Sequence, residues 1–306
     1  MAKTLRRVSG FAALAGLAAI SAASARADTL GPERFDAQNI RIDDFIGTVI
    51  IETAGRGRIE VTAEGEADKL ADLSFTVENG ALVISGEDPQ DFQRRNRNWF
   101  GGRDHDDIED EYPVIRVTAP RGLALSISDM IGRVEAGDIG GAFSMENRFV
   151  GEIEIGDVAS AEVDISGATD LNISDIAGAL DVQVSGAAEI YARSAESADI
   201  DVSGAGEIDL GEVRGGVTVR SSGAGDISID SVSGPVEARL SGAGNMEIGD
   251  GRAEPLRVRV SGVGHFCFDG VAVDPDVEES GLGSIELRAY EGNLRSRGDV
   301  DIGEGC

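Results

Sequence analysis

The sequence predicts an all-β protein whose second half is a β-solenoid built from rungs of about 19 residues. Three observations predict this fold class. A Ser-Gly-Ala motif recurs at nearly constant spacing, and apolar and polar residues alternate on both sides of each copy. Glycine is abundant and proline scarce, at 42 and 7 of 306 residues. This composition is typical of an ordered chain with many tight corners.

The repeat is the strongest of these signals. The motif or a close variant begins at Ser166, Ser185, Ser203, Ser222, Ser241, Ser261 and Ser280. The intervals are 19, 18, 19, 19, 20 and 19 residues, and weaker copies near Asp44, Asp129 and Arg148 extend the series toward the N-terminus. Units this short cannot bury an apolar face alone, so we expect them to be stable only when stacked.

The residues around each motif predict two short strands per rung, with room for a third straight piece. Apolar residues stand five and seven positions after each serine, as at Leu171 and Ile173, and one and three positions before it, as at Val184 and Val182. Polar residues fill the places between them. This period of two indicates strands with one buried face.

The motif itself has a structural interpretation. A coil must bend sharply, and glycine reaches positive φ freely, so we expect the glycines to supply the corners. The serine hydroxyl can satisfy a backbone group at the corner. The alternative is a glycine-rich cradle for a ligand.

Residues 1–27 have the three parts of a secretory signal: a basic start, an apolar middle over 11–23 and a small-residue exit at Ala25-Arg26-Ala27. The apolar stretch is short for a membrane anchor, which needs about 20 residues. We find no later stretch that reads as a transmembrane anchor. The sequence therefore predicts export to the periplasm or cell surface.

Residues 28–125 read as an N-terminal β region that caps the solenoid, and residues 126–306 as the solenoid repeats. Asn79-Gly80 is a strong hairpin signal. Residues 88–111 form a charged segment that we expect to be a long exposed loop. Trp99 and Phe100 lie between its cationic and acidic halves. The segment is either a solvated insertion or a recognition loop with Trp99 as its anchor.

Several segments resemble a known family. Val-Ser-Gly-Ala-Gly followed by an acid and isoleucine, the stretches 35–51 and 73–85, and the lead-in over 114–125 are similar to the autotransporter adhesin head GIN domain proteins of bacteria. The resemblance implies a right-handed parallel β-helix, broadly of the pectin-lyase shape. The family has no established activity and supplies no catalytic residues. Its name implies surface binding.

The charge of the chain restricts its partners. Without residues 1–27 the chain has 23 basic and 56 acidic residues, a net charge of −33. Such a surface repels nucleic acid and anionic lipid, so neither is an expected partner. The remaining candidate partners are a glycan and a protein of the envelope or cell surface.

Two columns of charged residues are candidate binding sites. Four positions after the serine, on consecutive rungs, stand Asp170, Glu189, Glu207 and Asp226. Stacked carboxylates repel one another unless a cation bridges them. Ca²⁺ prefers several oxygen ligands and is the candidate cation for this column. No other cofactor is expected, and ordinary solvation of these acids is the alternative.

The second column lies two positions before the serine. It contains Arg220, Arg239 and Arg259, with Arg257 beside them. In a chain this acidic, a basic stripe suggests docking of an acidic glycan or another carboxylate-bearing ligand. The alternative is pairing with nearby acids such as Glu237, which contributes little at a surface.

Cys267 and Cys306 are the only cysteines of the chain. In an oxidising compartment they can form a disulfide that ties the C-terminal tail to the solenoid. Free thiols or an intermolecular bridge are the alternatives. We recognise no catalytic constellation, so the sequence favours a non-catalytic, adhesin-like binding protein. A carbohydrate-active enzyme of pectin-lyase-like shape, and a structural envelope protein that binds a protein partner, are the competing interpretations.

Overall fold

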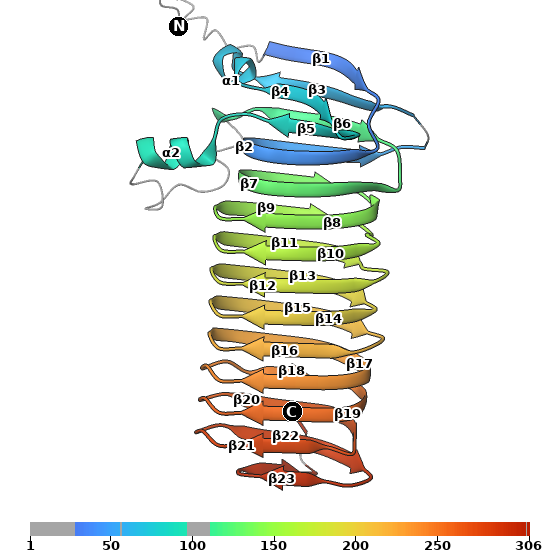
Figure 1. The fold of residues 1–306 in the computed structure, drawn as a ribbon, viewed down its shortest axis with the longest axis vertical. Coiled ribbons are helices and arrows are strands. Elements are labelled where there is room, and N and C mark those ends of the chain that lie inside the picture. Colours follow the sequence, from blue (N-terminus) through green and yellow to red (C-terminus); the bar gives the residue numbers. More distant parts are fainter. Residues whose placement is uncertain (1–27, 56, 97–110, 304) are drawn as a thin grey trace, which may run out of the picture.

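The computed structural model describes residues 28–55, 57–96, 111–303 and 305–306. The chain is 69% strand and 5% helix, and forms a β-solenoid of about nine turns with rungs about 19 residues apart. Figure 1 shows a rod with β1 at one end and β23 near the other. The all-β solenoid that the repeat predicts is therefore confirmed.

The N-terminal third combines strands with two short helices. In chain order these elements are β1 Asp28–Phe35, β2 Asn39–Thr53, β3 Ile59–Gly65, α1 Ala67–Ala71, β4 Ser74–Glu78, β5 Ala81–Ser85, α2 Pro89–Arg95 and β6 Val114–Ala119.

Only strands occur in the described residues after β6. They are β7 Leu123–Ala136, β8 Gly140–Asn147, β9 Val150–Ile155, β10 Ser160–Ile165, β11 Ala168–Asp175, β12 Ala179–Val184, β13 Ala187–Ala195, β14 Ser197–Val202, β15 Ala205–Val213, β16 Val217–Ser221, β17 Ala224–Leu240, β18 Met246–Ile248, β19 Gly251–Val260, β20 His265–Val273, β21 Asp276–Glu279, β22 Ser284–Glu291, β23 Arg295–Arg297 and β24 Val300–Ile302.

These strands form two parallel ladders along the rod. Ladder A joins β8, β10, β12, β14, β16, the end of β17, β19, β21 and β23. Ladder B joins β9, β11, β13, β15, the start of β17, β18, β20, β22 and β24. A third short straight piece follows ladder B, where Ser194 pairs with Glu212 and Glu212 with Ser231.

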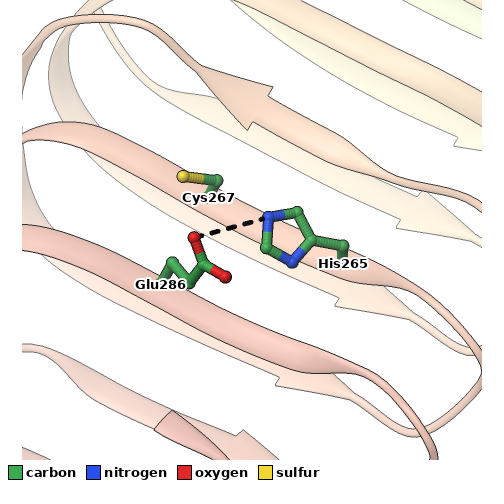
Figure 2. Close-up of side chains that lie close together, drawn as sticks. All are labelled: His265, Cys267 and Glu286. Carbon is green, nitrogen blue, oxygen red and sulfur yellow. Dashed lines mark ion pairs between the residues drawn. The ribbon is translucent and has the colours of Figure 1, made fainter. Parts of the chain in front are cut away.

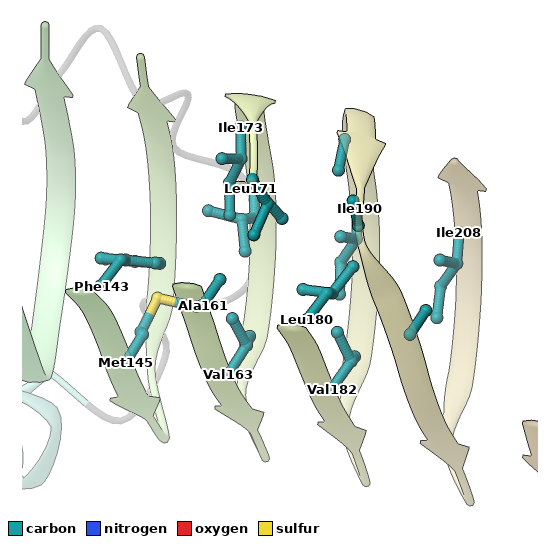
Figure 3. Packing of buried hydrophobic residues seen from close by; sticks show 14 of the residues in the cluster. Phe143, Met145, Ala161, Val163, Leu171, Ile173, Leu180, Val182, Ile190 and Ile208 are labelled. Atoms are coloured by element: carbon teal, nitrogen blue, oxygen red, sulfur yellow. The ribbon is translucent and has the colours of Figure 1, made fainter. Parts of the chain in front are cut away.

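The solenoid interior consists of stacked apolar columns. Leu171, Ile190 and Ile208 are successive partners in ladder B and are at most 2% exposed. Val163 and Val182 stack in the same way in ladder A (Figure 3). Each buried aliphatic side chain contributes about 1.5–3 kcal/mol through the hydrophobic effect, so the columns dominate the stability of the rod.

The motif glycines are required for a different reason from the one expected. Gly186, Gly204 and Gly223 do not have positive φ, whereas glycines such as Gly132 do. Instead, a Cβ on Gly223 would collide with the carbonyl oxygen of Gly204, and a Cβ on Gly204 with that of Gly186. The corner is therefore a place where successive rungs bring their backbones too close together for any side chain.

Left-handed corners do occur in the first rungs. Asp44 and Asp129 have φ of 48° and 49°. Three residues after each aspartate stands a glycine with positive φ, Gly47 at 139° and Gly132 at 128°. The two corners stack, because β2 and β7 pair in parallel over most of their length. Parallel stacking thus begins at β2, inside the N-terminal region.

The N-terminal end of the rod is an antiparallel layer. β5 and β6 pair in parallel with β2, β4 pairs antiparallel with β5, β3 with β6, and β1 with β3. The hairpin between β4 and β5 turns at Asn79 and Gly80, both with positive φ, as their Asn-Gly sequence predicts.

The segment 88–111 was expected to be loop throughout, but it begins with helix α2. Asp88 caps this helix by accepting a hydrogen bond of 2.7 Å from the backbone N–H of Gln90. Phe92 of α2 packs edge-on against Tyr112, with 5.9 Å between the ring centroids. Asp88 followed by Pro89 is a helix start signal. The high charge of the segment instead favoured its interpretation as a loop.

Candidate functional site

The acidic column forms on ladder B as expected. Asp170, Glu189, Glu207 and Asp226 are successive ladder partners, and all four are exposed. Within the described residues none of them has an ion-pair partner, although Asp226 accepts hydrogen bonds from Asn245 at 2.8 and 3.2 Å. Calcium binding by this column stays a prediction.

The arginine stripe lies on ladder A, around the corner from the acids. Arg220, Arg239 and Arg259 are ladder partners, and Arg257 stands in the adjacent column beside Glu237. Three of the four are paired with carboxylates: Arg220 with Asp199 at 3.0 Å, Arg239 with Glu237, and Arg259 with Asp276 and Glu278 at 3.4 and 3.3 Å. An acidic ligand would have to compete with these carboxylates.

The predicted recognition residues Trp99 and Phe100 lie outside the described residues. Their role as anchors stays a prediction.

The two cysteines are joined. Cys267 in β20 and Cys306 form a disulfide with a Cα–Cα separation of 5.7 Å. The tail is held further by a 2.9 Å hydrogen bond from the backbone N–H of Cys306 to Asp269. Of the pairings left open by the sequence, the structure contains the intramolecular one.

His265, Cys267 and Glu286 lie close together on β20 and β22, with their potential ligand atoms within 4.8 Å of one another (Figure 2). His265 Nε2 is 3.9 Å from a carboxylate oxygen of Glu286, and His265 Nδ1 is 2.8 Å from the Ser284 hydroxyl. Because the Cys267 sulfur belongs to the disulfide, it is no thiolate. Two remaining groups are fewer than the three protein ligands of a catalytic zinc site.

A hollow of about 690 Å³ lies at the corner that follows ladder B. Its walls come from five successive rungs, and its lining includes Asp157, Asp175, Tyr191, Arg193, Ser194, Glu212, Arg214 and Asp230. Tyr191 is 45% exposed and also lines a second hollow of about 190 Å³ on the neighbouring part of ladder B. The large hollow thus joins an exposed aromatic ring to a group of charged side chains.

The charged side chains of this hollow are partly ordered by hydrogen bonds. Arg193 donates two hydrogen bonds to Asp175, at 3.1 and 2.7 Å, and the Ser194 hydroxyl donates a third at 2.7 Å. Arg193 and Ser194 hold the pKa of Asp175 below its usual value, because both stabilise the carboxylate. Asp157 lies 3.6 Å from the same guanidinium.

Sequence reasoning did not identify this hollow. Its signal was present in the ladder B position six residues after each motif serine, where Tyr191 lies between Asn172 and Asp209. Parity shows that such a tyrosine points outward. The hollow depends on side chains that differ from one rung to the next, such as Tyr191 and Gly211, so the repeat does not predict it.

The fold and its repeated corners define an extended β-solenoid with exposed charged side chains on its outer columns. A family model, "Putative auto-transporter adhesin, head GIN domain", matches residues 40–229, more than half of the chain. The chain belongs to this family. It is an adhesin-like protein, as the resemblance of its motif implies.

Two of the solved structures that are similar to this chain are described as putative adhesins. A "putative adhesin" from Bacteroides fragilis is 15% identical with a TM-score of 0.42, over 88% of this chain and 98% of that one. A "putative adhesin" from Parabacteroides merdae is 11% identical with a TM-score of 0.44, over the same shares. No curated protein matches the chain. Within the described residues no helix is both long and apolar enough to cross a membrane.

Proposed function

We propose that this chain is an exported, non-catalytic, adhesin-like protein that binds a surface partner through the outer columns of its solenoid. The observation that carries the proposal is the register of ladders A and B, which places equivalent positions of successive rungs side by side. A position that contacts the partner on one rung therefore has its equivalent on the next rung, about 4.8 Å away. Weak contacts then add along the rod.

Export rests on the sequence of residues 1–27 and on the disulfide. Disulfides persist in oxidising compartments, which agrees with a periplasmic or cell-surface location. We expect cleavage after Ala27. Mass spectrometry of the protein recovered from the periplasm or medium will then find Asp28 at the N-terminus.

The binding function is tested with the labelled chain from Asp28 onward on intact bacterial cells and on host cells. The expected result is saturable retention on one of them, with the thermally unfolded protein as the matched control. Retention no greater than that of the unfolded chain on both cell types would contradict the proposal. So would the release of reducing ends from bacterial or host polysaccharides, since that would make the protein an enzyme.

The arginine stripe is the part of this surface suited to an acidic partner. Arg257 supports it, because this exposed side chain has no ion pair within the described residues. Arg239→Glu reverses one charge of the stripe and is expected to weaken retention if the surface partner is acidic.

A further inference from the structure

One position in the wall of the hollow beside Tyr191 lacks a side chain. Gly211 lies between Arg193 on one neighbouring rung and Asp230 on the other, as the flanking ladder pairs show. A Cβ on Gly211 would collide with the carbonyl oxygen of Arg193. The backbone approach that requires glycine here therefore also leaves no side chain at the position between Arg193 and Asp230.

Tyr191 supplies an apolar wall to this polar hollow. Its ladder partners are Asn172 and Asp209, whose side chains are shorter than the tyrosine ring. The ring lines both the 690 Å³ hollow and the 190 Å³ hollow. An exposed aromatic ring between two hollows presents apolar surface to any ligand that enters either of them.

The polar wall has both donors and acceptors. Arg193 has five N–H groups, and the hydrogen bonds to Asp175 leave some of them available. Glu212 and Asp230 are exposed and have no ion pair within the described part of the chain. Their carboxylates can accept hydrogen bonds from hydroxyl groups, while the guanidinium donates to hydroxyl oxygens.

We propose that this hollow binds a neutral pyranose glycan, with one sugar face stacked on Tyr191. A pyranose has an apolar C–H face and a rim of hydroxyl groups, which match the ring and the polar wall. The hollow extends over successive rungs about 4.8 Å apart, close to the length of one sugar residue, so it suits a short oligosaccharide running along the rod.

The charge of the lining selects a neutral sugar over an acidic one. The hollow contains the carboxylates of Asp157, Asp175, Glu212 and Asp230. Against them stand Arg193, already paired with Asp175, and Arg214, 3.4 Å from a carboxylate oxygen of Glu196. A uronic acid or sialic acid would add a negative charge to a site that has an excess of them.

This inference names the ligand of the proposed adhesin-like function and rests on it. The test is isothermal titration calorimetry of the chain from Asp28 onward with hexasaccharides of glucose, mannose, xylose and N-acetylglucosamine, and with hexagalacturonate as the acidic counterpart. The variants are Tyr191→Ala, Tyr191→Phe and Tyr290→Ala. Tyr290 is the matched control, because it is 42% exposed on β22, far from the hollow.

We expect at least one neutral hexasaccharide to bind with a Kd in the range of about 0.1–1 mM. Tyr191→Ala should weaken this binding about tenfold or more, because it removes the stacking surface. Tyr191→Phe should stay within about threefold of the native protein, and Tyr290→Ala should have no effect. Circular dichroism establishes that each variant is folded.

Three outcomes would overturn the site: no binding of any neutral hexasaccharide, tighter binding of hexagalacturonate, or binding that survives Tyr191→Ala but not Arg239→Glu. The cell-retention assay separates these results from failure of the proposed function. Retention on cells without any effect of Tyr191→Ala would sink the site and leave the adhesin-like function standing, whereas absence of retention would sink the function itself.

Discussion

At the scale of single residues, the stacked glycines set the tightest constraint on the fold. Gly204, Gly223 and Gly242 each lie directly over the carbonyl oxygen of the corresponding glycine one rung earlier. This close approach allows neighbouring corners to hydrogen bond, as in the 3.0 Å bond from Ala224 N–H to the Gly204 carbonyl. Glycine is therefore required at this corner by close backbone packing, because even the methyl group of alanine is too large.

Gly223→Ala is expected to destabilise the protein by about 1–3 kcal/mol, the usual cost of overpacking, because the backbone must move to accept the methyl group. Gly55→Ala is the control, since a Cβ there meets nothing within 4 Å. Urea unfolding measures both free energies. Equal free energies of unfolding for the two variants would show that the corners are not close-packed.

Asn147 shows what the repeat conceals at this scale. It is fully buried at a place where the next rung has Ile165. Its side-chain oxygen accepts a 3.0 Å hydrogen bond from the Met130 N–H, and its amide donates to Thr169 at 3.3 Å. Alternation predicts a buried side chain here, but it cannot show that a polar one joins the left-handed corner at Asp129 to the glycine corners that follow.

At the scale of strands and corners, the cluster of Asp175, Arg193 and Ser194 ties two rungs together. The pKa of Asp175 is lowered by its hydrogen bonds from Arg193 and Ser194, so the carboxylate favours the folded state. For a lowered pKa, this contribution is fully present above the unfolded value of about 3.9 and is lost as the pH falls through the folded pKa.

Asp175→Asn should therefore lower the free energy of unfolding at pH 7, and the difference from the native protein should shrink below about pH 4. Urea unfolding at pH 7, 5 and 3 measures this difference. Asp201→Asn is a suitable control, because this exposed ladder A aspartate lies outside the cluster. A difference that stays constant from pH 7 to pH 3 would contradict the linkage.

The two ends of the rod differ in structure. At the N-terminal end, we propose that the antiparallel layer of β1, β3 and β4 caps the solenoid, since it covers the edges that β5 and β6 would otherwise expose. At the other end, the tail is fastened back to β20 through Cys267.

Removing this disulfide should loosen the C-terminal end. The bond spans 39 residues, and closing a loop of that length is worth about 4 kcal/mol in the chain-entropy model. Cys306→Ser is expected to lower the Tm and to expose β21 to β24 to limited proteolysis, while β7 to β19 stay protected. Reduction of the native protein is the matching treatment. Unchanged proteolysis in both would show that the tail is held by other contacts.

At the scale of the whole molecule, the repeat predicts most of the architecture. Its period predicts the rungs, and its parity predicts which side chains form the apolar columns, such as Ile190 and Ile208. The outward acids and arginines also lie where the period places them. The repeat does not predict helix α2 or the hollow at Tyr191, because both depend on contacts between segments that differ from one rung to the next.

Net charge is a property of the whole rod and carries its own prediction. The net charge is −29, or −33 without residues 1–27, so negative charges on the surface of the folded protein repel one another. Salt screens this repulsion, with a Debye length of about 30 Å at 0.01 M and about 10 Å at 0.1 M. We expect the Tm of the chain from Asp28 onward to rise as sodium chloride is raised from about 0.01 to 0.5 M. A falling Tm, measured by differential scanning calorimetry, would mean that surface ion pairs outweigh the repulsion.

The disulfide also determines how the rod responds to mechanical tension. A force applied at Cys306 does not begin by peeling away β24 and β23, because the covalent bond passes the load directly to Cys267 in β20. The intervening strands β21 to β24 form a closed loop that bears little of that force. If the protein is held at its C-terminal end while its outer columns bind a surface, β20 and the rungs N-terminal to it therefore bear the shear force.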